Sequence, residues 1–296
     1  MKHSTENDQM FRNPAGTLGF EFVEYACADT RALGELFQSL GFSAVARHRS
    51  KRVTLYRQND IYFIVNAEPN SFAQSFASVH GTSVCAIAFR VSDAGAAFDY
   101  VRRKGARPYN GSIGPMEVNV PAIKGIGDSL IYLVDRFDGS TIYDVDFVAI
   151  DGAEEQNVGL TYVDHLTHNV YQGRMDSWAE FYQRLFNFRQ VRFFEIEGKR
   201  TGLRSRAMTS PCGKIRIPIN ESADDKSQIA EYLDAYRGEG IQHIALGTED
   251  IYASVEALLA RGVAFMDPLR SNITGSSMSA CRITVKISTV CVKTVF

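Results

Sequence analysis

The stretch YVDHLTHNV (162–170), followed by DSWAEFYQRLF (176–186) and NFRQVRFF (187–194), predicts a strand, an amphipathic helix and a second strand. An earlier segment has the same order, with GFEFVEYA (19–26) before DTRALGELFQSL (29–40). In both helical stretches the apolar residues recur at the i, i+3, i+4, i+7 spacing of one helix face. The sequence therefore contains an internal repeat of a strand–helix–strand unit.

Residues 85–109 and 242–267 form a second pair of matching segments, again a strand followed by a helix. Gly105 and Gly262 follow these two helices, where a left-handed C-cap favours glycine. We expect an aspartate to cap each of the four helices, because its carboxylate can accept from the free N–H groups of the first turn. The four capping residues predicted in this way are Asp29, Asp93, Asp176 and Asp250.

Alternating or β-branched runs such as RVTLYR (52–57) and KIRIPIN (214–220) lie between these units and are typical of strands. We predict an α+β fold of tandem duplicated βαβββ modules that form two open barrels, the second incomplete. A pair of ferredoxin-like domains without a cavity stays open on periodicity alone. The expected divisions are a disordered lead-in (1–13), a metal-free domain (14–150), an acidic boundary (151–159), a metal-binding domain (160–267) and a divergent tail (268–296).

The composition favours a small-molecule partner. The 32 basic and 34 acidic side chains leave a formal charge of −2, which gives no electrostatic reason to expect nucleic acid or a membrane surface. The five cysteines include no close pair, which argues against a zinc ribbon or a disulfide framework. No apolar run resembles a signal peptide or a membrane span. We therefore expect a soluble, cytoplasmic protein.

Two of the six histidines occupy matching places in the repeat. His165 lies in the first strand of the second half, and His243 lies in the strand that opens its second unit. The equivalent positions, Phe22 and Ala86, are apolar. His168 points to the opposite face of its strand from His165, because residues three apart alternate. Two imidazoles and one carboxylate are the ligand set of non-haem ferrous oxygenases, although zinc or manganese stays open on spacing alone.

Several long stretches resemble the 4-hydroxyphenylpyruvate dioxygenases of the vicinal-oxygen-chelate superfamily, and the resemblance covers residues 13–267. They are GTLGFEFVEYA (16–26), DHLTHNVYQGRMDSWAEFYQRLFNF (164–188), GLRSRAMTSPCGKIRIPINE (202–221) and KSQIAEYLDAYRGEGIQHIAL (226–246). The resemblance implies one Fe(II) per subunit, held by His165, His243 and a glutamate. It also implies substrate-binding roles for four polar residues, Ser205, Asn220, Gln228 and Gln242.

The implied reaction converts 4-hydroxyphenylpyruvate and O2 to homogentisate and CO2 in tyrosine and phenylalanine catabolism. The implied partners are a 2-oxo acid and O2, and the implied assembly is a homodimer or homotetramer. Three alternatives stay open: 4-hydroxymandelate synthase, which resembles the dioxygenase, a catalytically silent truncated homologue, and a ring-cleaving dioxygenase or glyoxalase on the same scaffold.

The tail departs from the family pattern. Residues 268–296 contain no Asp, Glu or His, so the expected glutamate ligand is absent from this chain. The last predicted strand of the first half, residues 142–150, has its counterpart at or past Phe296. Glu249 is a poor substitute, because it stands beside a helix cap and away from the metal. An altered reading frame or a divergent β-hairpin would each explain such a tail.

Overall fold

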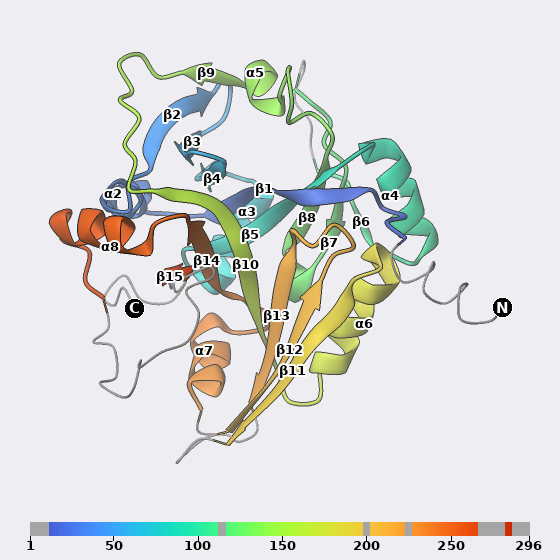
Figure 1. Cartoon of the computed structure of the whole chain (residues 1–296). Helices are drawn as coiled ribbons and strands as arrows, with labels where there is room; N and C mark the ends of the chain where they lie inside the picture. The colour runs from blue at the N-terminus through green and yellow to red at the C-terminus, as the bar shows by residue number, and fades with distance from the viewer. Residues whose placement is uncertain (1–11, 112–116, 198–201, 223–226, 266–281, 286–296) are drawn as a thin grey trace.

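Two mixed β-sheets form the frame of the computed structural model (Figure 1). The structure describes residues 12–111, 117–197, 202–222, 227–265 and 282–285. All strands of one sheet precede residue 150, all strands of the other follow residue 159, and residues 150–159 connect them. Neither sheet closes into a barrel through its described strands. The predicted α+β class is confirmed.

The first sheet has the strand order β6-β7-β8-β5-β1-β4-β3-β2-β9. Its strands are β1 (Thr17–Ala26), β2 (Ser43–His48), β3 (Val53–Gln58), β4 (Ile61–Asn66), β5 (Ser83–Val91), β6 (Pro108–Tyr109), β7 (Ala122–Lys124), β8 (Leu130–Val134) and β9 (Phe147–Ala149). Its helices are α2 (Thr30–Ser39), α3 (Phe72–His80), α4 (Ala94–Arg103), the 3-10 helix η1 (Ile126–Asp128) and α5 (Ile142–Asp146).

The second sheet has the order β11-β12-β13-β10-β14-β15. Its elements are β10 (Leu160–Val170), α6 (Met175–Phe186), β11 (Arg189–Glu197), β12 (Gly202–Thr209), β13 (Arg216–Ser222), α7 (Gln228–Tyr236), β14 (Gly240–Thr248), α8 (Ile251–Ala260) and β15 (Arg282–Val285). No described helix combines the length and apolar character needed to cross a bilayer. Apart from β15, the segment 268–296 that we expected to diverge lies outside the described residues, as does the lead-in up to residue 11.

The pairing of the strands shows the duplication directly. In the first sheet β1 runs parallel to β4 and antiparallel to β5. In the second sheet β10 runs parallel to β13 and antiparallel to β14. Each of the four central strands is followed by a helix, so the predicted repeat of strand–helix units is confirmed.

Three of the four predicted aspartate caps are confirmed, and one is wrong. The confirmed caps, each accepting from backbone N–H groups of its helix, are Asp29, Asp93 and Asp250. Helix α6 instead begins at Met175, which places Asp176 inside the first turn. The Asp176 carboxylate forms an ion pair with Arg206 on β12 at 2.7 Å, so this side chain links α6 to the sheet. Gly105 and Gly262 have the predicted left-handed backbone, with φ of 85° and 79°.

The predicted strand over residues 142–150 is only partly correct. Residues 142–146 form α5, and only residues 147–149 form a strand. The helix is favoured by a capping box, in which Thr141 and Asp144 exchange side-chain and backbone hydrogen bonds. This local pattern outweighs the β-branched composition that suggested a strand.

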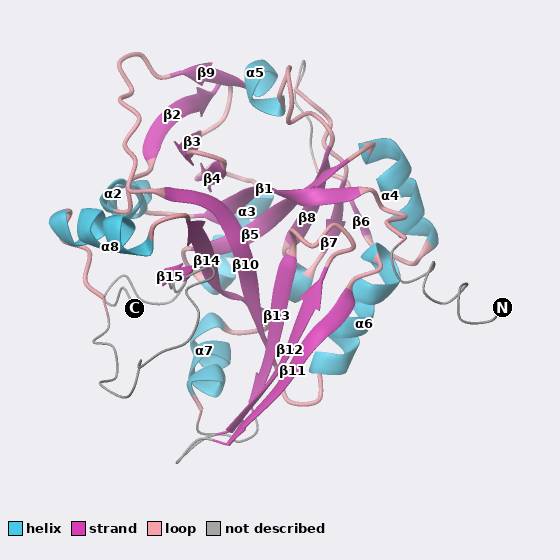
Figure 2. Ribbon diagram, viewed as in Figure 1, coloured by secondary structure: helices cyan, strands magenta, loops and turns pink. Residues whose placement is uncertain are grey.

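The two halves pack through helices on both sides of the paired sheets (Figure 2). On one side, Arg261 at the end of α8 donates to the carbonyl oxygen of Gln38 in α2 at 3.1 Å. On the other side, Arg184 of α6 donates to the carbonyl oxygen of Lys104 at the end of α4. These two hydrogen bonds therefore join the halves at two separate places.

A glycine lies at a close contact between the halves. Gly127 in η1 has φ 56°, and a Cβ placed on it would overlap the carbonyl oxygen of Glu239, just before β14. Glu239 is held in place, since its carboxylate accepts from the Trp178 indole at 2.7 Å and from the Tyr171 N–H at 3.1 Å. Only glycine fits this contact.

Gly127→Ala is expected to lower the free energy of unfolding more than the matched control Gly139→Ala. Both positions have a left-handed backbone, which costs a non-glycine residue about 1 kcal/mol. A Cβ at Gly139 meets nothing within 4 Å, whereas at Gly127 it displaces Glu239 and adds ~2 kcal/mol. Urea unfolding of the three proteins measures the difference; equal losses would contradict the tight contact between the halves.

His168 lies on the core face of β10. Its side chain is fully buried, and its Nε2 lies 2.7 Å from the hydroxyl of Tyr182 in α6. Burial lowers the pKa of His168 to about 3, so the folded protein holds a neutral imidazole there. As predicted from strand parity, His168 faces away from the side on which His165 lies.

The buried neutral His168 predicts a loss of stability in acid. The pKa is 6.5 in the unfolded chain and about 3 in the fold, so the unfolded chain takes up the proton first as the pH falls below 6.5. The resulting loss is about 2 kcal/mol at pH 5. His168→Gln is expected to remove this part of the pH dependence. Denaturant unfolding of metal-free protein at pH 7 and pH 5 tests it; an unchanged drop in the variant would contradict the assignment.

Candidate metal centre

His165 and His243 lie beside each other on neighbouring strands. Their ring centroids are 5.6 Å apart, and the ring planes are inclined by 75°. His243 on β14 is paired with Thr167 on β10, and Thr167 is two residues from His165, so all three side chains share a sheet face. His165 retains 19% exposure. The two imidazoles therefore converge on one accessible spot.

The first half presents the same backbone without the imidazoles. There Glu24 on β1 pairs with Ala86 on β5, as Thr167 pairs with His243 in the second half. Phe22, two residues before Glu24, then corresponds to His165. The register thus places Phe22 and Ala86 where the repeat predicted them. Only the second half combines two imidazoles at this point of the scaffold.

Both rings are oriented through Nδ1. The His165 Nδ1 lies 2.8 Å from Oδ2 of Asp164, and the His243 Nδ1 lies 2.5 Å from Oε1 of Gln242. An ionised carboxylate and an amide oxygen only accept, so each Nδ1 carries the proton and each Nε2 keeps a lone pair. Thr167 Oγ1 lies 2.9 Å from the His243 Nε2 and can donate to it.

This donor set fits a divalent transition metal, because neutral imidazoles that present Nε2 are common ligands of iron and zinc. A metal bound by the His243 Nε2 would take the place of the Thr167 hydroxyl. No group of three His, Cys, Asp or Glu side chains suited to a metal occurs among the described residues. The structure therefore brings together two of the three predicted ligands. Glu249, which we judged a poor substitute, is exposed next to the cap of α8.

A row of polar side chains continues from the histidines across the sheet. Asn169 on β10 pairs with Asn220 on β13, which pairs with Ser205 on β12. Asn169 alternates with Thr167 and His165, so the row lies on the histidine face. The Asn169 Oδ1 is buried without a hydrogen-bond partner among the described residues. The sequence analysis missed Asn169, although the alternation His165, Thr167, Asn169 was available as a signal.

The two predicted glutamines differ in position. Gln242 lies directly beside His243, and its Oε1 meets the His243 Nδ1. Gln228 is exposed in the first turn of α7, and no described hydrogen bond joins it to the histidines. The structure therefore groups Ser205, Asn220 and Gln242 with the imidazoles and leaves Gln228 outside the group.

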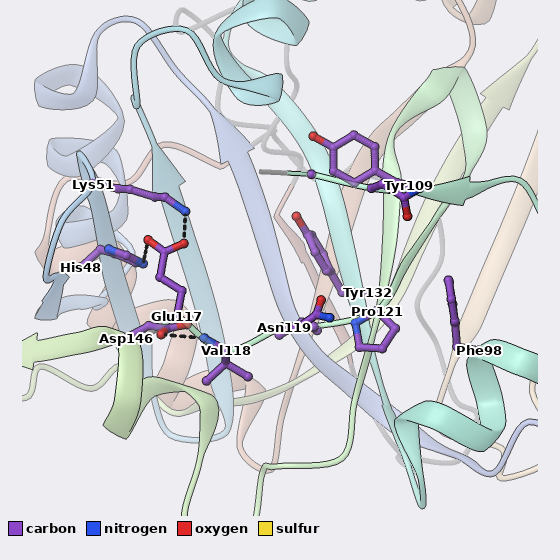
Figure 3. Close-up of a pocket in the computed structure, with 13 residues that line it drawn as sticks. His48, Lys51, Phe98, Tyr109, Glu117, Val118, Asn119, Pro121, Tyr132 and Asp146 are labelled. Atoms are coloured by element: carbon purple, nitrogen blue, oxygen red, sulfur yellow. Dashed lines mark hydrogen bonds and ion pairs between the residues drawn. The ribbon is translucent and has the colours of Figure 1, made fainter. Parts of the chain in front are cut away.

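A separate hollow of about 400 Å³ lies in the first half (Figure 3). Its polar side chains bind one another: Lys51 pairs with Glu117 at 2.6 Å, and the His48 Nε2 lies 3.8 Å from the same carboxylate. Asp146 accepts from the backbone N–H of Val118 at 3.1 Å. Burial lowers the pKa of His48. This hollow is lined by the other sheet and does not include the paired histidines.

Family models match both halves. A model described as "Hydroxyphenylpyruvate dioxygenase, HPPD, N-terminal" matches residues 11–148. A model of the "Glyoxalase/Bleomycin resistance protein/Dioxygenase superfamily" matches residues 162–285, so its match includes β15 and part of the segment that we expected to diverge.

Similar proteins extend across most of the chain. Hemolysin VllY of Vibrio vulnificus is 59% identical over 86% of this chain and 73% of its own length. A 4-hydroxyphenylpyruvate dioxygenase of Pseudomonas aeruginosa is 55% identical over 86% of this chain and 72% of its own. A solved structure of a 4-hydroxymandelate synthase variant from Streptomyces coelicolor has a TM-score of 0.72 at 25% identity, over 84% of this chain and 76% of that one. The chain therefore belongs to the family of the 4-hydroxyphenylpyruvate dioxygenases, which are non-haem iron enzymes.

Proposed function

We propose that the chain uses Fe(II) and O2 to convert 4-hydroxyphenylpyruvate to homogentisate and CO2. The observation that carries the proposal is the convergence of His165 and His243, with ring centroids 5.6 Å apart and both Nδ1 atoms facing acceptors. The relative named as this dioxygenase, at 55% identity, supports the choice of substrate.

In this proposal the Nε2 atoms of His165 and His243 hold the metal. When bound, ferrous iron supplies the redox chemistry that the use of dioxygen requires. In the metal-free protein the Thr167 hydroxyl lies against the His243 Nε2, so it has to turn away when that nitrogen binds the metal. The glutamate that the family resemblance implies as third ligand is not among the described residues, and residues 268–296 contain no acid.

The polar row has a binding role in the same proposal. Ser205 and Asn220 offer hydroxyl and amide groups to the polar end of an aromatic acid, and Asn169 adds an amide oxygen that is buried without a described partner. Gln242 contacts His243 and borders the same spot. A few fixed polar groups of this kind orient a ligand whose ring is held by apolar contacts.

We propose that residues 14–150 form a metal-free domain and residues 160–267 the metal-binding domain. The protein then acts as a cytoplasmic homodimer or homotetramer in tyrosine and phenylalanine catabolism. Two rivals have specific support. The structural similarity to 4-hydroxymandelate synthase favours the same substrate with a different product. The two-ligand centre among the described residues favours a catalytically silent homologue.

His165→Ala and His243→Ala are each expected to weaken Fe(II) binding at least about 100-fold, since loss of a ligand costs more than loss of a neighbour that only orients it. His48→Gln serves as the matched control, because His48 lies in the hollow of the first half. Anaerobic titration with Fe(II) measures the affinity without requiring turnover. Wild-type affinity in both alanine variants would contradict the proposed site.

Product analysis separates the proposed reaction from its rivals. Purified protein with Fe(II), O2 and 4-hydroxyphenylpyruvate is expected to consume O2 and release homogentisate, identified by chromatography and mass spectrometry. Release of 4-hydroxymandelate instead would favour the synthase. Bound iron without any O2 uptake would favour the silent homologue.

A further inference from the structure

An extra residue interrupts the pairing of β10 with β14 directly before the first histidine. Val163 pairs with Leu246 and His165 pairs with Ala245, so the register shifts at Asp164, which forms a β-bulge. In a regular strand the side chains of Asp164 and His165 would point to opposite faces. A bulge re-aims the extra residue, and bulges often occur next to active sites.

The bulge allows the Asp164 carboxylate to reach the ring of its neighbour. Its Oδ2 lies 2.8 Å from the His165 Nδ1, and its Oδ1 lies 2.5 Å from Nη1 of Arg216 on β13. The Asp164 side chain is fully buried, whereas that of Arg216 is 38% exposed. The carboxylate is therefore fixed between a guanidinium that donates and an imidazole nitrogen that must also donate.

A second bulge has the same relation to the second histidine. Thr167 pairs with His243 and His168 pairs with Ile241, so Gln242 is the extra residue, this time on β14. The Gln242 side chain meets the His243 Nδ1. In both cases the residue directly before the histidine is bulged, and its side-chain oxygen contacts the Nδ1 of that histidine.

The first half shows that the bulges belong to the scaffold. An extra residue lies on β1 between Phe20 and Val23, and Cys85 is the extra residue on β5, where Gln242 stands in the second half. Glu21 in the first bulge pairs with Arg90 at 2.5 Å. A bulge and a carboxylate–arginine pair occur in both halves, although Arg90 lies on β5 and Arg216 on β13. Only in the second half does an imidazole follow the bulge.

We propose that Asp164, held by Arg216, is a positioning residue that fixes His165 in its Nδ1–H tautomer and so reserves Nε2 for the metal. The inference deepens the proposed function and rests on its metal site. Outer partners of this kind set the tautomer and orientation of a metal-binding histidine, and their loss costs 10- to 100-fold in metal affinity as an order of magnitude.

Asp164→Asn is the decisive variant, because it keeps the size of the side chain. Arg216 only donates, so it draws the amide oxygen toward itself and turns the amide NH2 toward the His165 Nδ1. The imidazole must then accept at Nδ1 and carry its proton on Nε2. The same exchange in a serine-protease triad preserves the geometry and inverts the tautomer. Replacing Arg216 by Met as well frees the amide to rotate and return its oxygen to Nδ1.

The tautomer is read by nitrogen-15 NMR of metal-free protein with labelled histidine at about pH 8, above the ordinary imidazole pKa. The His165 signals are those missing in His165→Ala. Co(II) titration, followed by its visible absorption, measures metal affinity independently of turnover. In the wild type we expect His165 to carry its proton on Nδ1. In Asp164→Asn we expect the proton on Nε2 and ~10- to 100-fold weaker Co(II) binding. In Asp164→Asn/Arg216→Met we expect the Nδ1–H tautomer and the Co(II) affinity to be partly restored.

Asp176→Asn is the matched control, since Asp176 also pairs with an arginine of the second sheet at 2.7 Å but is 80% exposed on α6. It is expected to leave the His165 tautomer and Co(II) affinity unchanged. An Nδ1–H ring with wild-type Co(II) affinity in Asp164→Asn would overturn the positioning role, while loss of Co(II) binding in His165→Ala would still uphold the metal site. Wild-type Co(II) binding in His165→Ala would instead overturn the metal site itself.

Discussion

The antiparallel pairing of β10 with β14 is the constraint on which the candidate site depends. It places Thr167 opposite His243 and brings His165 to the same face, so that two rings distant in sequence lie 5.6 Å apart. The opposite face of β10 is fully committed to the core, where His168 meets Tyr182. A slip of the strand by one residue would exchange these two faces. The register is therefore fixed from both sides of the sheet.

The repeat made much of this arrangement predictable. Hydrophobic spacing located the helices that follow the four central strands, and strand parity separated His165 from His168. The prediction failed where contacts of individual side chains decide where a helix begins or whether a segment is helix or strand. Asp176 forms an ion pair across to β12 instead of a cap, and the Thr141–Asp144 capping box turns a β-branched run into α5. Neither partner choice is visible in hydrophobic periodicity.

The immediate surroundings of the histidines were harder to predict than the histidines themselves. Alternation along a strand assigns Asp164 to the face opposite His165, and only the bulge brings the two side chains together. Arg216 reaches the site from a strand some fifty residues onward, joined through tertiary pairing alone. Alternation with His165 and Thr167 assigns Asn169 to the histidine face, but its neighbours Asn220 on β13 and Ser205 on β12 follow only from tertiary pairing.

The two halves share their strand order around β1 and β10 and their bulges, yet they differ at the positions where the second half has the paired imidazoles. In the first half the buried Glu24, whose pKa is raised by burial, accepts from Asn66 and has Ala86 as its strand partner. The two halves thus share their backbone structure, and the chemical difference between them lies in a few side chains. During divergence, such a centre can be gained or silenced by changes in very few codons while the architecture persists.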